Sequence, residues 1–317
     1  MTKKNQSCGF RTSIGGQALI EGILMRGPKK QAIVCRTKDG LVEKVEDIKL
    51  DKDKHPILGW PFVRGCAIFL DSMYKGMQAL TYSASLIPEE EQEEPDKLDK
   101  WISEHFPAEK AQKLIIGTAV VLGIALSLLL FIFLPTLIVG FIKPLTLNYF
   151  FRNISEGVLK VVILLIYMKL CTRVSDVQRL FSYHGAEHKT IFCYEHGREL
   201  TVENVRTESR FHPRCGTSFL LVVIVVSILV NSVVLLDNSF ARMGCHLLLL
   251  PVVVGISYEI NRWCGRHDNV VSAALSAPGK WLQRITTNEP DDGMIECAIR
   301  AMELVIPEEK GLDEWGK

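Results

Sequence analysis

The stretch Leu114–Leu134, LIIGTAVVLGIALSLLLFIFL, decides the fold class of this 317-residue chain. Its 21 residues carry no charge and, as a helix, are long enough to cross the ~30 Å hydrocarbon layer of a bilayer. Pro135 then ends or kinks that helix. Gly216–Leu236 is a second uncharged run of comparable length. Two uncharged runs longer than about 18 residues are unusual in the core of a soluble protein, so we predict an integral membrane protein.

Two further apolar segments bring the expected number of transmembrane helices to about four. Val158–Leu170 carries Lys160 near one end, where a long side chain can reach the interface, and it spans only if it begins near Ile154. Gly244–Ile260 is the fourth segment. We therefore predict a mostly α-helical integral membrane protein, preceded by an N-terminal cytoplasmic α+β segment.

Charge sets the expected orientation and partners. The loop between the second and third segments is basic, with Arg173, Arg179, Lys189, Arg198, Arg206, Arg210 and Arg214. Basic loops stay on the cytoplasmic side, so this loop and both termini are expected to face the cytosol from a bacterial plasma membrane. The net charge of +1 argues against a nucleic-acid-binding protein, and nine scattered cysteines suit a reducing compartment. The lipid bilayer is the expected partner; the substrate or membrane partner is undefined, and an oligomer is left open.

The N-terminal part carries the clearest β pattern. Gln31–Ile48, QAIVCRTKDGLVEKVEDI, alternates apolar and polar residues on both sides of Asp39–Gly40, which predicts a β-hairpin. Ile14–Pro28 is punctuated by glycine and indicates tight turns around a short element rather than a long helix. Phe62–Leu80 has apolar residues at helical spacing. This helix either packs on the hairpin or lies on the membrane surface.

The segments divide the chain into six expected regions. A cytoplasmic α+β domain covers residues 1–87, and an acidic, proline-flanked linker covers 88–112. The others are a transmembrane hairpin at 113–172, a cytoplasmic loop at 173–215, a second transmembrane hairpin at 216–262 and a cytoplasmic helical tail at 263–317.

The cytoplasmic loop contains the strongest chemical motif, YHGAEHK at Tyr183–Lys189. In a helix, His184 and His188 lie one turn apart on the same face, with Glu187 beside them. This is the H-x-x-E-H pattern, in which two histidines bind zinc and the glutamate acts as general base toward a water molecule. The simple alternative is a polar loop with solvated histidines. Gly185 and Ala186 leave neighbouring positions small, which would allow another element to approach this helix closely.

A catalytic zinc site needs a third protein ligand, because it usually has three and keeps one position open. His212 and Cys215 are candidates, since Pro213 between them favours a turn rather than a helix. Glu259 is another, because an ionisable residue at the end of an apolar run needs a partner or a polar cavity; its alternative is an ion pair with Arg262. If His212 and Cys215 both joined the two histidines of the motif, the closed site would be structural.

Five motifs together carry a family resemblance: GGQALIEGILMRGP, SYHGAEHKTI, FHPRCGTSF, SYEINRW and PGKWLQRITTNEPDD. With these in order from about Ile14 to Val305, the chain resembles the bacterial YqhQ-like membrane proteins, a family known as a domain of unknown function. The resemblance implies a metal-dependent enzyme without an agreed substrate. The chain matches the family's motif at His184, Glu187, His188, His212, Cys215 and Glu259.

Two hypotheses of different classes follow. The first is a membrane-bound zinc-dependent hydrolase with its site at the cytoplasmic face and an amide bond as the leading substrate class, in which Glu187 is the general base. The second is a non-enzymatic membrane scaffold or assembly protein with a structural zinc site. A channel or transporter is less well supported, since the predicted spans carry few charges and no internal repeat.

Overall fold

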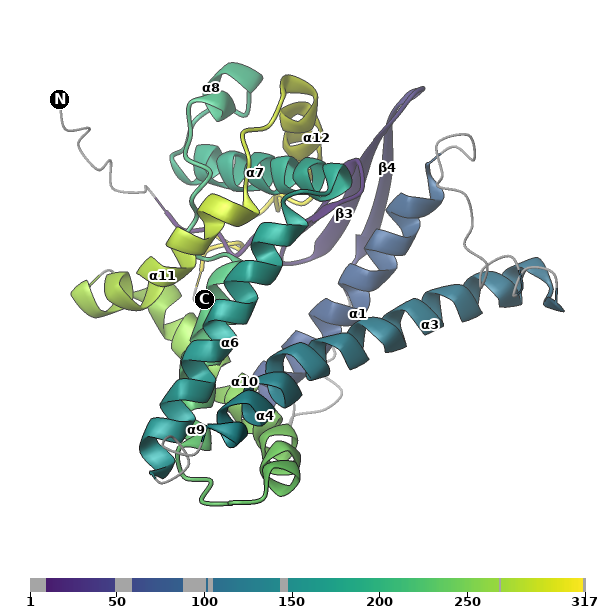
Figure 1. Cartoon of the computed structure of the whole chain (residues 1–317). Coiled ribbons are helices and arrows are strands. Elements are labelled where there is room, and N and C mark those ends of the chain that lie inside the picture. Colours follow the sequence, from purple (N-terminus) through teal and green to yellow (C-terminus); the bar gives the residue numbers. More distant parts are fainter. Residues whose placement is uncertain are drawn as a thin grey trace. The chain divides into compact units, whose positions relative to one another are not determined.

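The computed structural model describes residues 10–48, 59–87, 101, 105–142, 148–267 and 269–315. These form a mostly helical chain with an N-terminal four-stranded antiparallel sheet (Figure 1). The chain divides into two compact units, one made of Met1–Leu86, Met168–Val226 and Pro251–Lys317, the other of Ile87–Tyr167 and Ser227–Leu250. The predicted acidic linker at 88–112 lies largely outside the described residues, and its last residues already belong to a helix.

The sheet belongs to the first unit and has the order β1-β2-β3-β4. Its strands are β1 (Gly15–Leu19), β2 (Gly22–Arg26), β3 (Lys30–Thr37) and β4 (Gly40–Asp47). The predicted hairpin is confirmed as β3–β4, and Gly40 takes the positive φ of 122° that its tight turn requires. The expectation of tight turns around a short element in Ile14–Pro28, rather than a long helix, is confirmed, because this stretch forms a second hairpin, β1–β2, whose turn has Glu21 at a φ of 49°. The sequence did not assign its two strands.

Helices cover both faces of the sheet (Figure 1). Three of them do so: α1 (Val63–Ser85), α7 (Ser175–Glu195) and α12 (Asp292–Glu303). Since side chains alternate along a strand, Ile23 and Met25 of β2 face α7 and α12, while Leu24 faces the cluster that contains Ala79 of α1. Burial of each such large apolar side chain contributes roughly 1.5–3 kcal/mol. Packing of the predicted Phe62–Leu80 helix on the sheet is therefore confirmed at its C-terminal end.

The other helices complete the two units. They are α3 (Ala108–Leu128), the π-helical turn η4 (Leu129–Phe133), α4 (Leu134–Phe141), α6 (Tyr149–Cys171), α8 (Val202–Arg206), α9 (Gly216–Asn231), α10 (Ser239–Arg266) and α11 (Val270–Thr286). Helical structure continues through Pro135, whose missing amide directly follows the irregular hydrogen bonding of η4.

Two helical stretches within the described residues are long and apolar enough to cross a membrane, Leu114–Phe141 and Ser239–Arg266. Of the other two predicted spans, Gly216–Leu236 is helical only as far as Asn231, where the Asn153 amide donates to the Asn231 carbonyl oxygen at 3.2 Å. The remaining span corresponds to α6, which is 23 residues long but carries several charged side chains.

Candidate metal centre

Helix α7 positions the H-x-x-E-H motif in the interior of the first unit. Tyr183 and Ala186, both fully buried, belong to the core between α7 and the sheet, while His184 and His188 line a cavity beside strand β1. The prediction that Gly185 admits another element is confirmed. A Cβ at this position would collide with the carbonyl oxygen of Asn288, whose amide donates to the Phe181 carbonyl oxygen at 2.9 Å.

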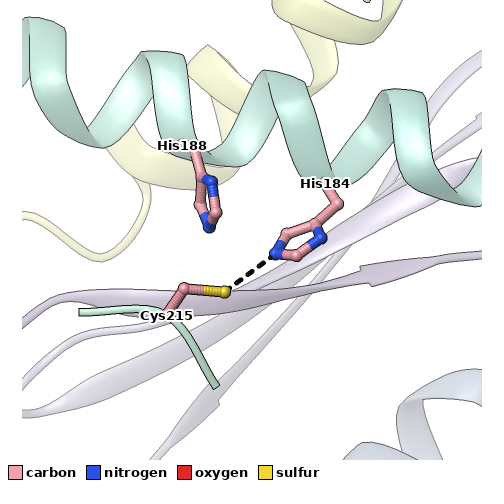
Figure 2. Close-up of side chains that lie close together, drawn as sticks. All are labelled: His184, His188 and Cys215. Atoms are coloured by element: carbon pink, nitrogen blue, oxygen red, sulfur yellow. Dashed lines mark hydrogen bonds between the residues drawn. The ribbon is translucent and has the colours of Figure 1, made fainter. Parts of the chain in front are cut away.

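The chain brings three candidate ligands together at this helix. The ligand atoms of His184, His188 and Cys215 all lie within 4.8 Å of one another (Figure 2). Cys215 precedes α9, and its Sγ lies 3.1 Å from Nε2 of His184. Two imidazole nitrogens and a thiol sulfur are suitable donors for a divalent transition metal. These three residues could therefore hold one.

Backbone carbonyl groups fix the orientation of both imidazole rings. Nδ1 of His184 donates to the Thr286 carbonyl oxygen at 2.9 Å, and Nδ1 of His188 donates to the Arg210 carbonyl oxygen at 2.6 Å. Because a carbonyl oxygen only accepts, each Nδ1 carries a proton and each Nε2 is left for the side of Cys215. Metal-binding histidines commonly donate the second ring N–H in this way. The ring orientations fit a metal site.

The electrostatic environment favours the charged forms of Cys215 and His184, which are in contact. Burial disfavours the Cys215 thiolate, but His188 and His184 outweigh it and hold the pKa of this thiol well below its usual range. Burial likewise opposes the charged ring of His184, while the adjacent Cys215 sulfur raises its pKa to about 9. These shifts favour a thiolate–imidazolium pair, in which the sulfur has the form that binds a metal.

Glu187 lies beside the three donors. Its Oε1 accepts a hydrogen bond from the Gly16 amide at 3.0 Å, and burial raises the pKa of its carboxyl against the opposing effect of the two histidines. Glu187, His184, His188 and Cys215 line one cavity of about 410 Å³. A carboxylate with a raised pKa at the wall of a cavity is suited to accept a proton and release it again.

His212 lies next to this group but makes other contacts. Its Nε2 is 3.4 Å from Oε2 of Glu195, and its ring centre is 5.6 Å from that of His188. Burial lowers the pKa of His212 to about 4, so the ring is neutral. Glu195 also accepts from the Thr12 amide at 2.9 Å and forms an ion pair with Arg214. Through these contacts, the buried carboxylate of Glu195 holds the turn His212–Cys215 in place next to the three donors.

Glu259 is bound elsewhere. Its two carboxylate oxygens accept from Nε and Nη2 of Arg64 at 2.6 and 2.5 Å. This pair takes the place of the ion pair that its spacing to Arg262 suggested. Within the described residues Glu259 does not join the donor group.

Sequence reasoning did not find several residues of the site. Glu195 stands seven positions after His188, so its place on the same side of α7 could have been noticed. The carbonyl groups of Thr286 and Arg210 carry no side-chain signal, since any residue supplies a carbonyl. Gly16, which donates to Glu187, lies in a stretch that the sequence did not assign to a strand.

Comparison with known proteins places the chain in a family without giving its activity. A family model described as "Protein of unknown function (DUF1385)" matches residues 60–308. The chain is 34% identical over 305 residues to "Uncharacterized protein YqhQ" of Bacillus subtilis (strain 168). The aligned region covers 92% of each of the two sequences. No solved structure matches. The chain is a member of the YqhQ-like DUF1385 family.

Proposed function

We propose that this protein is a membrane-bound, zinc-dependent hydrolase whose site faces the cytoplasm. The observation that carries the proposal is the convergence of His184 Nε2, His188 Nε2 and Cys215 Sγ to within 4.8 Å, with each imidazole oriented by a carbonyl acceptor. The donor set is the reason for choosing zinc, which accepts both imidazole nitrogen and thiolate sulfur. When bound, zinc would polarise a carbonyl group and lower the pKa of water.

Three protein donors support catalysis over a purely structural site. Catalytic zinc sites keep one position open, whereas structural sites usually have four protein ligands. The residue that would have closed the site, His212, is instead hydrogen-bonded to Glu195. The scaffold hypothesis needs His212 as a ligand, so we regard it as the less well supported alternative.

Glu187 would serve as the general base. It is held by the Gly16 amide at the wall of the cavity, and burial raises its pKa, which favours proton uptake. His184 and His188 would bind and orient the ion, and the Thr286 and Arg210 carbonyl groups would maintain the ring orientations. Cys215 would supply the only anionic ligand.

The sheet edge supports a peptide as the substrate. β1 is the edge strand of the sheet, and no other strand of the described residues pairs with its outer side. Gly15–Ala18 of β1 line the same cavity as the three donors. An extended peptide can add to an exposed sheet edge through backbone hydrogen bonds. A peptide paired with β1 would bring a backbone amide close to Glu187.

The proposal includes a multi-pass membrane topology. Leu114–Phe141 and Ser239–Arg266 would span the bilayer, accompanied by the shorter α9 and the more polar α6. This arrangement would leave the basic loop that contains α7 on the cytoplasmic side.

Metal content tests the ligand set. The purified full chain should contain about one zinc ion per molecule, and the Cys215→Ser and His184→Ala variants should lose most of it in elemental analysis. His267→Ala and Cys171→Ser are matched controls. His267 is exposed, and its ring contacts Trp263 rather than the donor group; Cys171 also lies outside the donor group. Wild-type protein without stoichiometric metal, or variants that retain it, would rule out the site.

Glu187→Gln separates the enzyme from the scaffold. The substitution keeps the shape of the side chain and an oxygen for the Gly16 amide, so metal should be retained. Hydrolysis of a peptide library should fall by about 10²–10⁴-fold if Glu187 is the base. A metal-loaded wild type without hydrolytic activity toward peptides, lipids or other amides would favour the scaffold.

A further inference from the structure

The second unit buries a cluster of polar and ionisable side chains outside the metal centre. Each of these residues is at most 9% exposed, and they come from α4, α6 and α10: Thr136, Arg152, Asn153, Glu156, Lys160, Arg242 and His246. Arginine, lysine and glutamate are rarely buried to this extent unless they are paired. The pairing within the cluster therefore decides what the cluster can bind.

Positive charge exceeds negative charge in this cluster. Arg242 pairs with Glu156, with Nη2 and Oε1 2.9 Å apart. Among the described residues, Arg152 pairs with Asp237 at 3.6 Å, but the Asp237 side chain is 82% exposed. Lys160 adds a third cation. Glu156 is thus the one buried carboxylate against three cations among the described residues of the cluster.

Several buried nitrogen atoms lack a partner among the described residues. They are Nε and Nη2 of Arg152, Nε of Arg242 and both ring nitrogens of His246. The amide oxygens of Asn153 and Asn231 also lack one, and Oε1 of Glu156 lies at ion-pair distance from Arg242 without a hydrogen bond. Buried polar atoms are nearly always hydrogen-bonded, so this interior needs additional acceptors. Water could serve donors and oxygens alike, but it would leave the excess of positive charge uncompensated.

We propose that this cluster binds a phosphate group, with Arg152 and Arg242 as its principal donors. Guanidinium groups match the geometry of phosphate oxygens, and the buried Nε of each arginine has no hydrogen-bond partner among the described residues. The ligand would neutralise the excess charge and satisfy the unpaired donors together. The phosphate group comes either from inorganic phosphate or from the headgroup of an anionic phospholipid. The inference does not depend on the hydrolase, because none of these residues belongs to the metal centre.

Thermal unfolding of the full chain in detergent tests phosphate binding directly. At constant ionic strength, inorganic phosphate should raise the melting temperature of the wild type in a saturable way relative to chloride, by on the order of 5 °C when in large excess over its dissociation constant. Arg152→Gln should abolish this shift and leaves the Arg242–Glu156 pair untouched. Arg173→Gln, which removes an exposed arginine outside the cluster, should keep it.

A second variant and a lipid arm complete the experiment. Asp237→Asn removes the exposed carboxylate near Arg152 and should tighten phosphate binding without disturbing the interior. If a lipid supplies the phosphate group, native mass spectrometry should detect retained phosphatidylglycerol on the wild type, reduced in Arg152→Gln, after extraction from vesicles of phosphatidylcholine and phosphatidylglycerol. Equal melting temperatures in phosphate and chloride, combined with equal lipid retention by wild type and Arg152→Gln, would overturn the proposal.

Discussion

Replacing Gly185 by alanine should weaken the metal site although residue 185 does not touch it. The added Cβ would lie far inside van der Waals contact with the carbonyl oxygen of Asn288. One atom of the clash is a Cβ and the other is a backbone oxygen, so no change of side-chain rotamer relieves it. The segment that contains Thr286 and Asn288 must move away from α7, and it carries the carbonyl group that orients His184.

The substitution should lower both the unfolding free energy and the zinc affinity. Overpacking costs about 1–3 kcal/mol, and loss of the Asn288–Phe181 hydrogen bond costs about 0.5–1.5 kcal/mol. The better helix propensity of alanine offsets about 0.5–1 kcal/mol. A net loss of about 2 kcal/mol in unfolding free energy remains. Zinc affinity should fall about 10–100-fold, as is usual when a contact that orients a metal-binding histidine is removed.

Two measurements on the full chain check this. Thermal unfolding in detergent reports the stability, and competition with a chromophoric chelator, well below the melting temperature, reports the zinc affinity of folded protein. Gly123→Ala is the matched control, because it also adds a methyl group to a helical glycine but meets nothing within 4 Å. If Gly185→Ala kept the stability and the zinc affinity of the wild type, packing of the Thr286 segment against α7 would not be what orients His184.

Two more substitutions test single contacts. Glu259→Gln should leave zinc content unchanged in elemental analysis, because its carboxylate bonds Arg64; loss of metal would return Glu259 to the ligand set. Glu195→Gln should reduce the acid sensitivity of folding. Although burial works in the opposite direction, His212, Arg214 and the Thr12 amide lower the pKa of Glu195 below 4.5, so its stabilising contribution is present above that pH and is lost as the pH falls through the folded-state pKa. Melting temperatures of the wild type and Glu195→Gln should therefore converge at low pH, and parallel curves would contradict this.

The sequence predicted those parts of the fold and of the site that depend on residues close together in the chain. The alternation around Asp39–Gly40 specified the β3–β4 hairpin, and four-residue spacing specified the shared face of His184 and His188. Both depend on backbone periods that hold for any helix or strand. Pro213 excluded a helix before Cys215 and so made that cysteine a candidate.

Contacts between distant segments could not be predicted. Arg64 lies 195 residues from Glu259, and nothing in either local pattern distinguishes this partner from the nearby Arg262. Glu156 of α6 pairs with Arg242 of α10, and no local pattern in the sequence indicates a partner so far away in the chain. The hairpin β1–β2 was missed because glycine signals a turn and is also tolerated in an edge strand.

The residues around the candidate metal centre are synthesised in an order that affects how the site would assemble. His184 and Cys215 are 31 positions apart, whereas the Thr286 carbonyl group arrives 102 positions after His184. An unfinished chain already holds every donor and could capture an ion loosely. The ring of His184 gains its carbonyl acceptor only when the segment that contains Thr286 docks against Gly185, so capture of an ion and tightening of the site would be separate events in biosynthesis.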